Sequence, residues 1–296
     1  MMKALLLLLA TLAPATAPPT AIDNLHVDPS WPRPIMLYAA GCSESIFAVK
    51  TLERLLQNVS TDTYFFGGED LTGMSGAGAV VDKQRAVQAA HPAGGATWVF
   101  KGGAGRKQMG GRIGLGLHAV GTRAVSVWRS NVLDFTACAI RDCFASPAKG
   151  TAVATATGAR STLCFKRRWP GMGNATRARL DIGHLRHTVQ AGLRVGTIHA
   201  KELWEAGFGR VATVTVEDLS AYEWIGGNAT SLNVSVVAWS KVLTAVSVNH
   251  TLDGVEQFLQ GAGMFSRPVK SQRETLYNFD EAEAELRGTE WAWMLH

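Results

Sequence analysis

The sequence lacks both of the short glycine motifs that identify many nucleotide-binding proteins. It contains no G-x-G-x-x-G and no G-x-x-x-x-G-K-[ST], although glycine is frequent between residues 67 and 121. The first absence excludes the usual dinucleotide-binding fingerprint, and the second excludes a Walker A phosphate loop. A phosphate-binding loop in this chain must therefore follow another pattern.

Long hydrophobic runs are missing beyond the first residues of the chain. Residues 4–13 are apolar and follow Lys3, and a run of this length suits a secretory signal peptide better than a membrane span. We expect residues 1–17 to be a signal peptide, or a short membrane anchor if they are not cleaved. The prolines of residues 18–34 predict an extended stem, so the folded domain is expected at residues 35–296.

Several N-glycosylation sequons agree with entry into the secretory pathway. We therefore expect a glycoprotein that is either secreted or resident in the Golgi lumen. The asparagines of these sequons are Asn58, Asn174, Asn228, Asn233 and Asn249.

Cysteine is scarce, since the chain has only Cys42, Cys138, Cys143 and Cys164. In an oxidising lumen four cysteines can pair completely in any of three ways. A disulfide between Cys143 and Cys164 is favoured, because Cys42 falls in an expected loop and Cys138 in an expected helix. Four buried free thiols are the alternative.

Acidic residues are almost absent from one basic part of the chain. Between Arg160 and Arg194 the lysines and arginines are accompanied by a single acid, Asp181. Such a segment would attract an anionic cofactor or glycan. Nucleic acid is not expected, because only Phe165 and Trp169 supply aromatic side chains there.

The alternation of strand-like and helix-like hydrophobic patterns along the chain predicts the fold class. Short β-like runs occur at residues 35–38, 63–66, 97–100, 123–128 and 210–216. Helical patterns lie among them at residues 45–58, 82–91, 131–144 and 178–206. Strands that alternate with helices favour a P-loop-like α/β fold in three layers, with a mostly parallel sheet flanked by helices.

Ligands of such sheets bind beyond the carboxyl ends of the strands. Here these positions are the loop at residues 41–47, then Lys101, Arg129, and Glu217 with Asp218. The loop consists of small residues and precedes an amphipathic helix, whose first N–H groups and dipole favour an anion. The loop and Arg129 together predict a site for a ligand that carries phosphate groups.

These two segments resemble the P-loop sulfotransferases, which use 3′-phosphoadenosine 5′-phosphosulfate as the sulfuryl donor. That family has a strand, a loop of the type [KR]-S-G-[ST]-[ST] and a helix, and later a strand ending in R-N-P-x-D with a serine seven residues after the asparagine. In this chain Ser43 and Ser45 would supply the loop hydroxyls. Asn131 and Asp134 keep the N-x-x-D spacing, and Cys138 stands where the serine belongs.

The resemblance continues towards the end of the chain. Residues 214–219 look like the family's strand ending in E-D-L, and residues 239–248 are similar to the helix after it. The resemblance implies a sulfotransferase that takes the nucleotide donor as co-substrate, needs no metal and sulfates a hydroxyl acceptor, with a glycan expected. Membrane contact is expected only if the N-terminal segment stays uncleaved.

The resemblance also implies roles for single residues. Because the chain has no cation in the loop itself, Lys101, at another expected strand end, is the expected catalytic substitute, and Glu44 is either the base or simply the start of the helix. Arg267 and Lys270 would close over the donor's phosphates. The implied donor-binding residues are Gly41, Cys42, Ser43, Ser45, Ile46, Phe47, Arg129, Asn131, Cys138, Arg267 and Lys270.

Departures from the family pattern favour an alternative from another class of protein. In register, Glu44 stands at the family's loop cation, Ile46 at its glycine and Ser130 at the arginine beside the asparagine. A degenerate relative that keeps the fold and binds anions or glycans without catalysis would show such changes. A third hypothesis is a kinase-like transferase with residues 100–107 as its phosphate loop.

The histidines do not point to a catalytic or metal centre. His184 and His187 lie three apart in an expected helix, and His199 follows, but no cysteine or carboxylate pattern completes a metal site. His91 and His118 are candidate bases only because they are near the glycine-rich segments.

Overall fold

A computed structural model describes residues 27–39, 42, 45–60, 63–70, 74, 76–91, 95–103, 111–145, 173–209, 211–224, 228–261 and 270–295. Its sheet has five strands in the order β2–β3–β1–β4–β5, and every neighbouring pair is parallel. The predicted α/β class with a parallel sheet is therefore confirmed. The strands are β1 (Ile35–Ala39), β2 (Tyr64–Asp70), β3 (Ala96–Gly103), β4 (Arg123–Trp128) and β5 (Ala212–Thr215).

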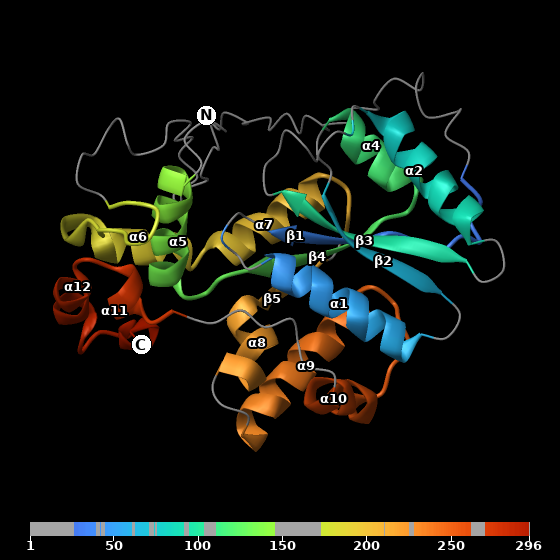
Figure 1. Ribbon diagram of the computed structural model, residues 1–296. Helices are drawn as coiled ribbons and strands as arrows, with labels where there is room; N and C mark the ends of the chain where they lie inside the picture. The colour runs from blue at the N-terminus through green and yellow to red at the C-terminus, as the bar shows by residue number, and fades with distance from the viewer. Residues whose placement is uncertain are drawn as a thin grey trace, which may run out of the picture.

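Helices cover both faces of this sheet (Figure 1). One face carries α1 (Ser45–Val59), α8 (Val216–Trp224), α9 (Ala229–Ala245) and α10 (Leu252–Gly261). The other face carries α2 (Ala77–Ala90), α4 (Arg112–Ala119) and α7 (Val195–Glu205). The fold is thus a three-layer sandwich of helices, sheet and helices.

Strand β1 supplies side chains to both hydrophobic cores of the sandwich. Ile35 and Leu37 belong to the core under α1 and α9. Met36 and Tyr38 belong to the core under α2, α4 and α7. Successive strand residues point to opposite faces, so a central strand must be apolar throughout. This is why the sequence alone predicts a buried strand at residues 35–38.

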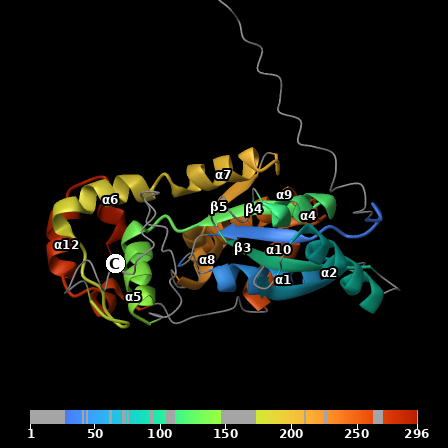
Figure 2. The ribbon, with the colours of Figure 1, turned by 90° about the horizontal axis from the view of Figure 1, so that it is seen from above.

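A third group of helices lies beyond the carboxyl ends of the strands (Figure 2). Its core includes Leu133, Val189, Leu276 and Leu286. The last residues of the chain therefore pack against the segment that follows β4. The elements of this group are α5 (Val132–Ala145), η2 (Ile182–His184), α6 (Leu185–Gly192), α11 (Gln272–Thr275), α12 (Phe279–Leu286) and η3 (Ala292–Met294).

Two expected elements have different boundaries. The strand at residues 210–216 is expected to lead into E-D-L, but β5 ends at Thr215 and Glu217 lies in the first turn of α8, where carboxylates are favoured. The single helix expected at residues 178–206 is wrong. Residue Ala178 pairs instead with Leu276 in a parallel bridge, and the remainder divides into η2, α6 and α7.

Within the glycine-rich stretch at residues 67–121, α4 begins at Arg112. A Cβ at Gly116 would stand 2.6 Å from the carbonyl oxygen of Ala77 in α2. Glycine therefore serves here to bring two helices together. Within the part of the chain that the structure describes, no helix is long and apolar enough to cross a bilayer.

Candidate functional site

The chain leaves β1 and β4, which are neighbours in the sheet, towards opposite faces. From β1 it enters α1 on one face, whereas from β4 it passes through α5 and α6 to α7 on the other face. In open parallel sheets such a switch point forms the ligand crevice. The two segments that the sequence singled out therefore meet at one place, beyond Ala39 and Trp128.

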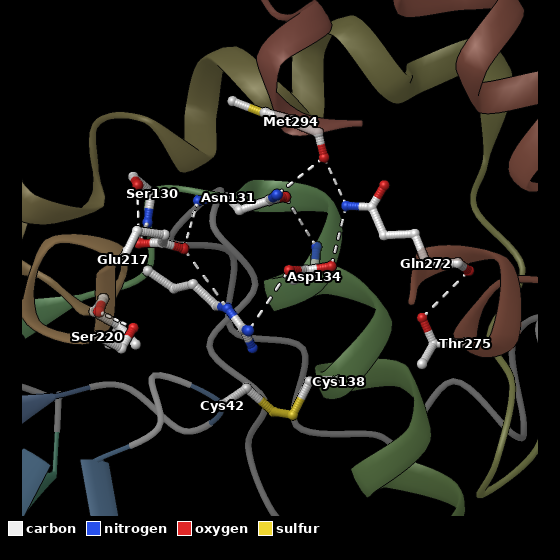
Figure 3. Close-up of polar contacts among 12 residues, drawn as sticks. Cys42, Ser130, Asn131, Asp134, Cys138, Glu217, Ser220, Gln272, Thr275 and Met294 are labelled. Carbon is white, nitrogen blue, oxygen red and sulfur yellow. Dashed lines mark hydrogen bonds and ion pairs between the residues drawn. A yellow bond between two sulfur atoms is a disulfide. The ribbon is translucent and has the colours of Figure 1, made fainter. Parts of the chain in front are cut away.

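A disulfide between Cys42 and Cys138 crosses this switch point (Figure 3). It joins the loop after β1 to α5 across 96 residues, with a Cα–Cα distance of 5.7 Å. The free-thiol alternative is thus wrong for these two cysteines, because a loop and a helix that are remote in sequence lie side by side in the fold. The favoured partners, the Cys143 side chain and Cys164, lie outside the described residues.

The disulfide changes what Cys138 can contribute. A bonded cysteine has no S–H to donate, so it cannot replace the hydrogen bond of the family's serine. Its sulfur instead fixes the position of the loop relative to α5. A disulfide in the fold is compatible with an oxidising compartment.

The guanidinium of Arg129 lies between two carboxylates at the switch point. Its side chain is 8% exposed, with Nη2 3.5 Å from Asp134 Oδ2 and Nε 3.7 Å from Glu217 Oε1. Asp134 belongs to the first turn of α5, and Glu217 to the first turn of α8. A buried cation needs such compensation. The predicted phosphate-binding arginine is therefore in the expected place, but it is already ion-paired.

The carboxylate of Glu217 also lies against the residues that precede α5 (Figure 3). It accepts hydrogen bonds from the backbone N–H and the hydroxyl of Ser130, at 2.9 and 2.8 Å, and from the backbone N–H of Asn131 at 3.0 Å. These N–H groups precede a helix and would otherwise attract an anion. The chain thus supplies its own anion at this position, a role that the sequence did not reveal.

The N-x-x-D spacing has a local structural cause. Asn131 Oδ1 accepts the backbone N–H of Asp134, at 3.3 Å, as an N-cap of α5 does. Asn131 Nδ2 donates to the carbonyl oxygen of Met294, 2.9 Å away. Gln272 Nε2 donates to the same carbonyl and to Asp134 Oδ1, at 2.6 and 3.1 Å. The C-terminal segment therefore closes one side of the site, and no local sequence signal indicates Gln272 or Met294.

The other predicted donor-binding residues divide into three groups. Ser45, Ile46 and Phe47 form the first turn of α1, where Phe47 is buried in the core, so only its backbone could meet a ligand. Lys270 is exposed and lies two residues before Gln272. The remaining predicted residues lie outside the described part of the chain, and they are Gly41, Ser43, Glu44 and Arg267.

Lys101 is not at the end of its strand as expected. It pairs with Leu37 in the middle of the sheet, and β3 continues to Gly103. The phosphate loop of the kinase-like hypothesis therefore begins as a strand, and residues 104–107 of it lie outside the described residues.

The histidines are dispersed. His184 is exposed and forms a 3.0 Å pair with Asp181. His199 is 4% exposed, lies against Tyr38, and has a pKa lowered to about 4 because it is buried. His91 stacks on Tyr64 at the amino end of β2. Among the described residues no group of histidine, cysteine and acidic side chains is arranged to hold a metal ion.

Comparisons with protein-family models, with curated proteins and with solved structures each found no match for this chain. The class that the fold and the site define is that of a three-layer α/β protein with a buried group of charged side chains at the switch point of its parallel sheet.

Proposed function

We propose that this chain is a sulfotransferase-like protein of the secretory lumen. It binds 3′-phosphoadenosine 5′-phosphosulfate at the carboxyl ends of β1 and β4 and sulfates a hydroxyl, with a glycan as acceptor. The observation that carries this proposal is the meeting of the loop after β1 with the Arg129 segment, joined by Cys42–Cys138. A donor that has phosphate groups at both ends needs two such anion sites close together.

Each anion site has its own donors in this arrangement. The first turn of α1, from Ser45 to Phe47, directs N–H groups at the phosphosulfate end. Arg129 and the start of α5 would receive the 3′-phosphate, for which Glu217 must withdraw from Ser130 and Asn131. Lys270 lies two residues before Gln272, whose amide donates to Asp134, and it would supply the late basic segment that the resemblance implies.

The chemistry requires few protein groups. The sulfur–oxygen bond to the donor phosphate breaks as the acceptor oxygen bonds to sulfur, and adenosine 3′,5′-bisphosphate leaves. A base takes the acceptor's hydroxyl proton, and positive charge stabilises the leaving phosphate. Glu44 remains the proposed base and Lys101 the proposed cation, the latter from the neighbouring strand β3.

The ion pairs of Arg129 favour a second function, in which a degenerate relative binds acidic glycans without catalysis. Asp134 and Glu217 together outweigh the single charge of Arg129. A donor phosphate must compete with both carboxylates, which lowers its affinity. Glycan binding at another surface would not meet this competition.

Calorimetric titration with adenosine 3′,5′-bisphosphate tests donor binding. We expect saturable binding that weakens several-fold in Lys270→Gln, an exposed position where the change leaves the fold intact. Lys201→Gln, at another exposed lysine, on α7, serves as the matched control and should bind as the wild type does. Absence of saturable binding at millimolar ligand would contradict the proposal.

Transfer is tested separately with sulfate-labelled donor and a pool of glycans. Label in any glycan supports the enzyme. Saturable nucleotide binding without transfer identifies the degenerate relative instead, and binding of sulfated glycans without nucleotide binding does so as well.

A further inference from the structure

A cavity lies at the opposite end of the sheet from the switch point, where the strands begin. Its volume is about 640 Å³, and it is lined by residues at the start of four strands, namely Ile35, Phe65, Thr97 and Arg123. The segment before β1, the end of α1 and the segment after α9 complete its walls. Small-molecule sites have volumes of roughly 300–1,000 Å³, so the cavity is large enough for a ligand the size of a sugar.

The cavity is positively charged. Arg33 and Arg123 line it, and no lining residue is acidic. Both arginines line the same cavity, and the pKa of Arg123 is lowered by burial and, to a lesser degree, by the charge of Arg33. Among the described residues neither arginine forms an ion pair with a carboxylate, and Arg123 donates to the carbonyl oxygen of Val246. Two like charges that share a cavity favour an anion between them.

An unsatisfied hydroxyl lies in the same wall. Thr97 is 0% exposed, and its Oγ1 has no hydrogen-bond partner among the described residues. Buried polar groups are nearly always paired, so an unpaired one needs an explanation. Because Thr97 is a lining residue, a ligand oxygen that reaches this part of the wall would accept the hydroxyl and remove the cost of leaving it unpaired.

We propose that this cavity binds a sugar-sized molecule that carries an oxyanion, either a sulfate ester or a carboxylate. The anion lies between Arg33 and Arg123 and accepts the Thr97 hydroxyl, since guanidinium groups bind oxyanions through paired N–H donors. Trp31 and Phe65 supply apolar surface for the carbon skeleton. The inference is independent of the proposed donor site, because it concerns the other end of the sheet.

Titration of the full secreted chain with glucose 6-sulfate, glucuronate and glucose tests the ligand class. The two anionic sugars should bind and glucose should not. Equal affinity for all three, or binding of none of them at millimolar concentration, would overturn the proposal.

Substitutions assign the binding to this cavity. Thr97→Val removes the hydroxyl at nearly constant volume, and we expect unchanged or higher thermal stability with about tenfold weaker binding of glucose 6-sulfate. Thr122→Val is the matched control, because Thr122 also has a buried, unpaired hydroxyl but does not line the cavity. Arg33→Gln should abolish binding, whereas Arg85→Gln on α2 should not. Equal binding by both threonine variants would refute the site.

Asn249 lines the cavity and belongs to a sequon. All titrations are therefore repeated with Asn249→Gln, which cannot carry a glycan there. Binding in both forms supports a ligand from solution. Binding only in Asn249→Gln would mean that the chain's own glycan fills the cavity, which contradicts the proposal.

Discussion

The carboxylate of Glu217 accepts hydrogen bonds from both the backbone N–H and the hydroxyl of Ser130. Glu217, in the first turn of α8, thereby satisfies donors that lie just before α5, a helix much earlier in the chain. The same carboxylate pairs with Arg129. Glu217 is thus an internal competitor for any anion that binds at the switch point.

Glu217→Gln tests this competition. Loss of the negative charge should raise the affinity for adenosine 3′,5′-bisphosphate several-fold, because Arg129 then has one carboxylate fewer beside it. The same change should lower the free energy of unfolding by about 1–3 kcal/mol, since charge-assisted hydrogen bonds are replaced by weaker neutral ones. Calorimetry and denaturant unfolding measure the two effects.

Glu281→Gln is the matched control for this variant, because among the described residues Glu281 forms only an exposed pair with Arg179. Exposed pairs contribute little, so neither affinity nor stability should change. If Glu217→Gln also leaves nucleotide affinity unchanged, Glu217 does not compete for the ligand.

Removal of the disulfide by Cys42→Ser with Cys138→Ser should reduce stability. In the chain-entropy account a cross-link across this many residues stabilises the fold by roughly 4.7 kcal/mol. Denaturant unfolding with and without reductant checks the assignment, because reductant should destabilise the wild type more than the double variant. An equal effect of reductant on both proteins would contradict a structural role for Cys42–Cys138.

The buried imidazole of His199 predicts loss of stability in acid. Its pKa in the fold is about 4, below the ordinary value of 6.5, because burial disfavours the charged form. Between these values the unfolded chain binds more protons than the folded chain. The contribution of His199 is therefore complete above pH 6.5 and decreases by roughly 3 kcal/mol as the pH falls towards 4.

Replacement of the ring isolates this contribution. His199→Leu should remove that part of the pH dependence of the unfolding free energy between pH 7 and pH 4. His184→Leu makes the same change at an exposed position and serves as the matched control. Parallel pH profiles for the wild type and His199→Leu would show that His199 is not responsible.

Two helical glycines predict opposite effects of the same substitution. Gly116→Ala would push a Cβ against the backbone of Ala77, and we expect a loss of about 1–3 kcal/mol from overpacking. Gly78→Ala in α2 meets nothing within 4 Å and should stabilise the fold by roughly 0.5 kcal/mol, because alanine favours the helix. Thermal unfolding of the two variants measures both. Equal melting temperatures would mean that α2 and α4 are not in close contact.

Elements with an uninterrupted local pattern could be predicted closely. The run at residues 123–128 is β4, and the strand, loop and helix at residues 35–58 form β1 and α1. The pattern failed where tertiary contacts override it, as at Ala178, which pairs with Leu276 instead of joining a helix. Nor does a local pattern indicate the close contact between α2 and α4 that explains Gly116.

The candidate site could be predicted only in part. Arg129 was indicated by its place after a strand, whereas its partners Asp134 and Glu217 were not assigned to it. Lys101 was misplaced, because the apolar run ends before the strand does.

The sequence by itself determined the α/β class and the position of the switch-point segments, because the hydrophobic periodicity of a short segment predicts buried strands and amphipathic helices. Only the tertiary structure decided that Cys42 bonds to Cys138, and that Glu217 and Asp134 enclose Arg129. These contacts join elements that are remote in sequence and become neighbours only when the sheet forms. A local sequence pattern does not predict which of their side chains will face each other.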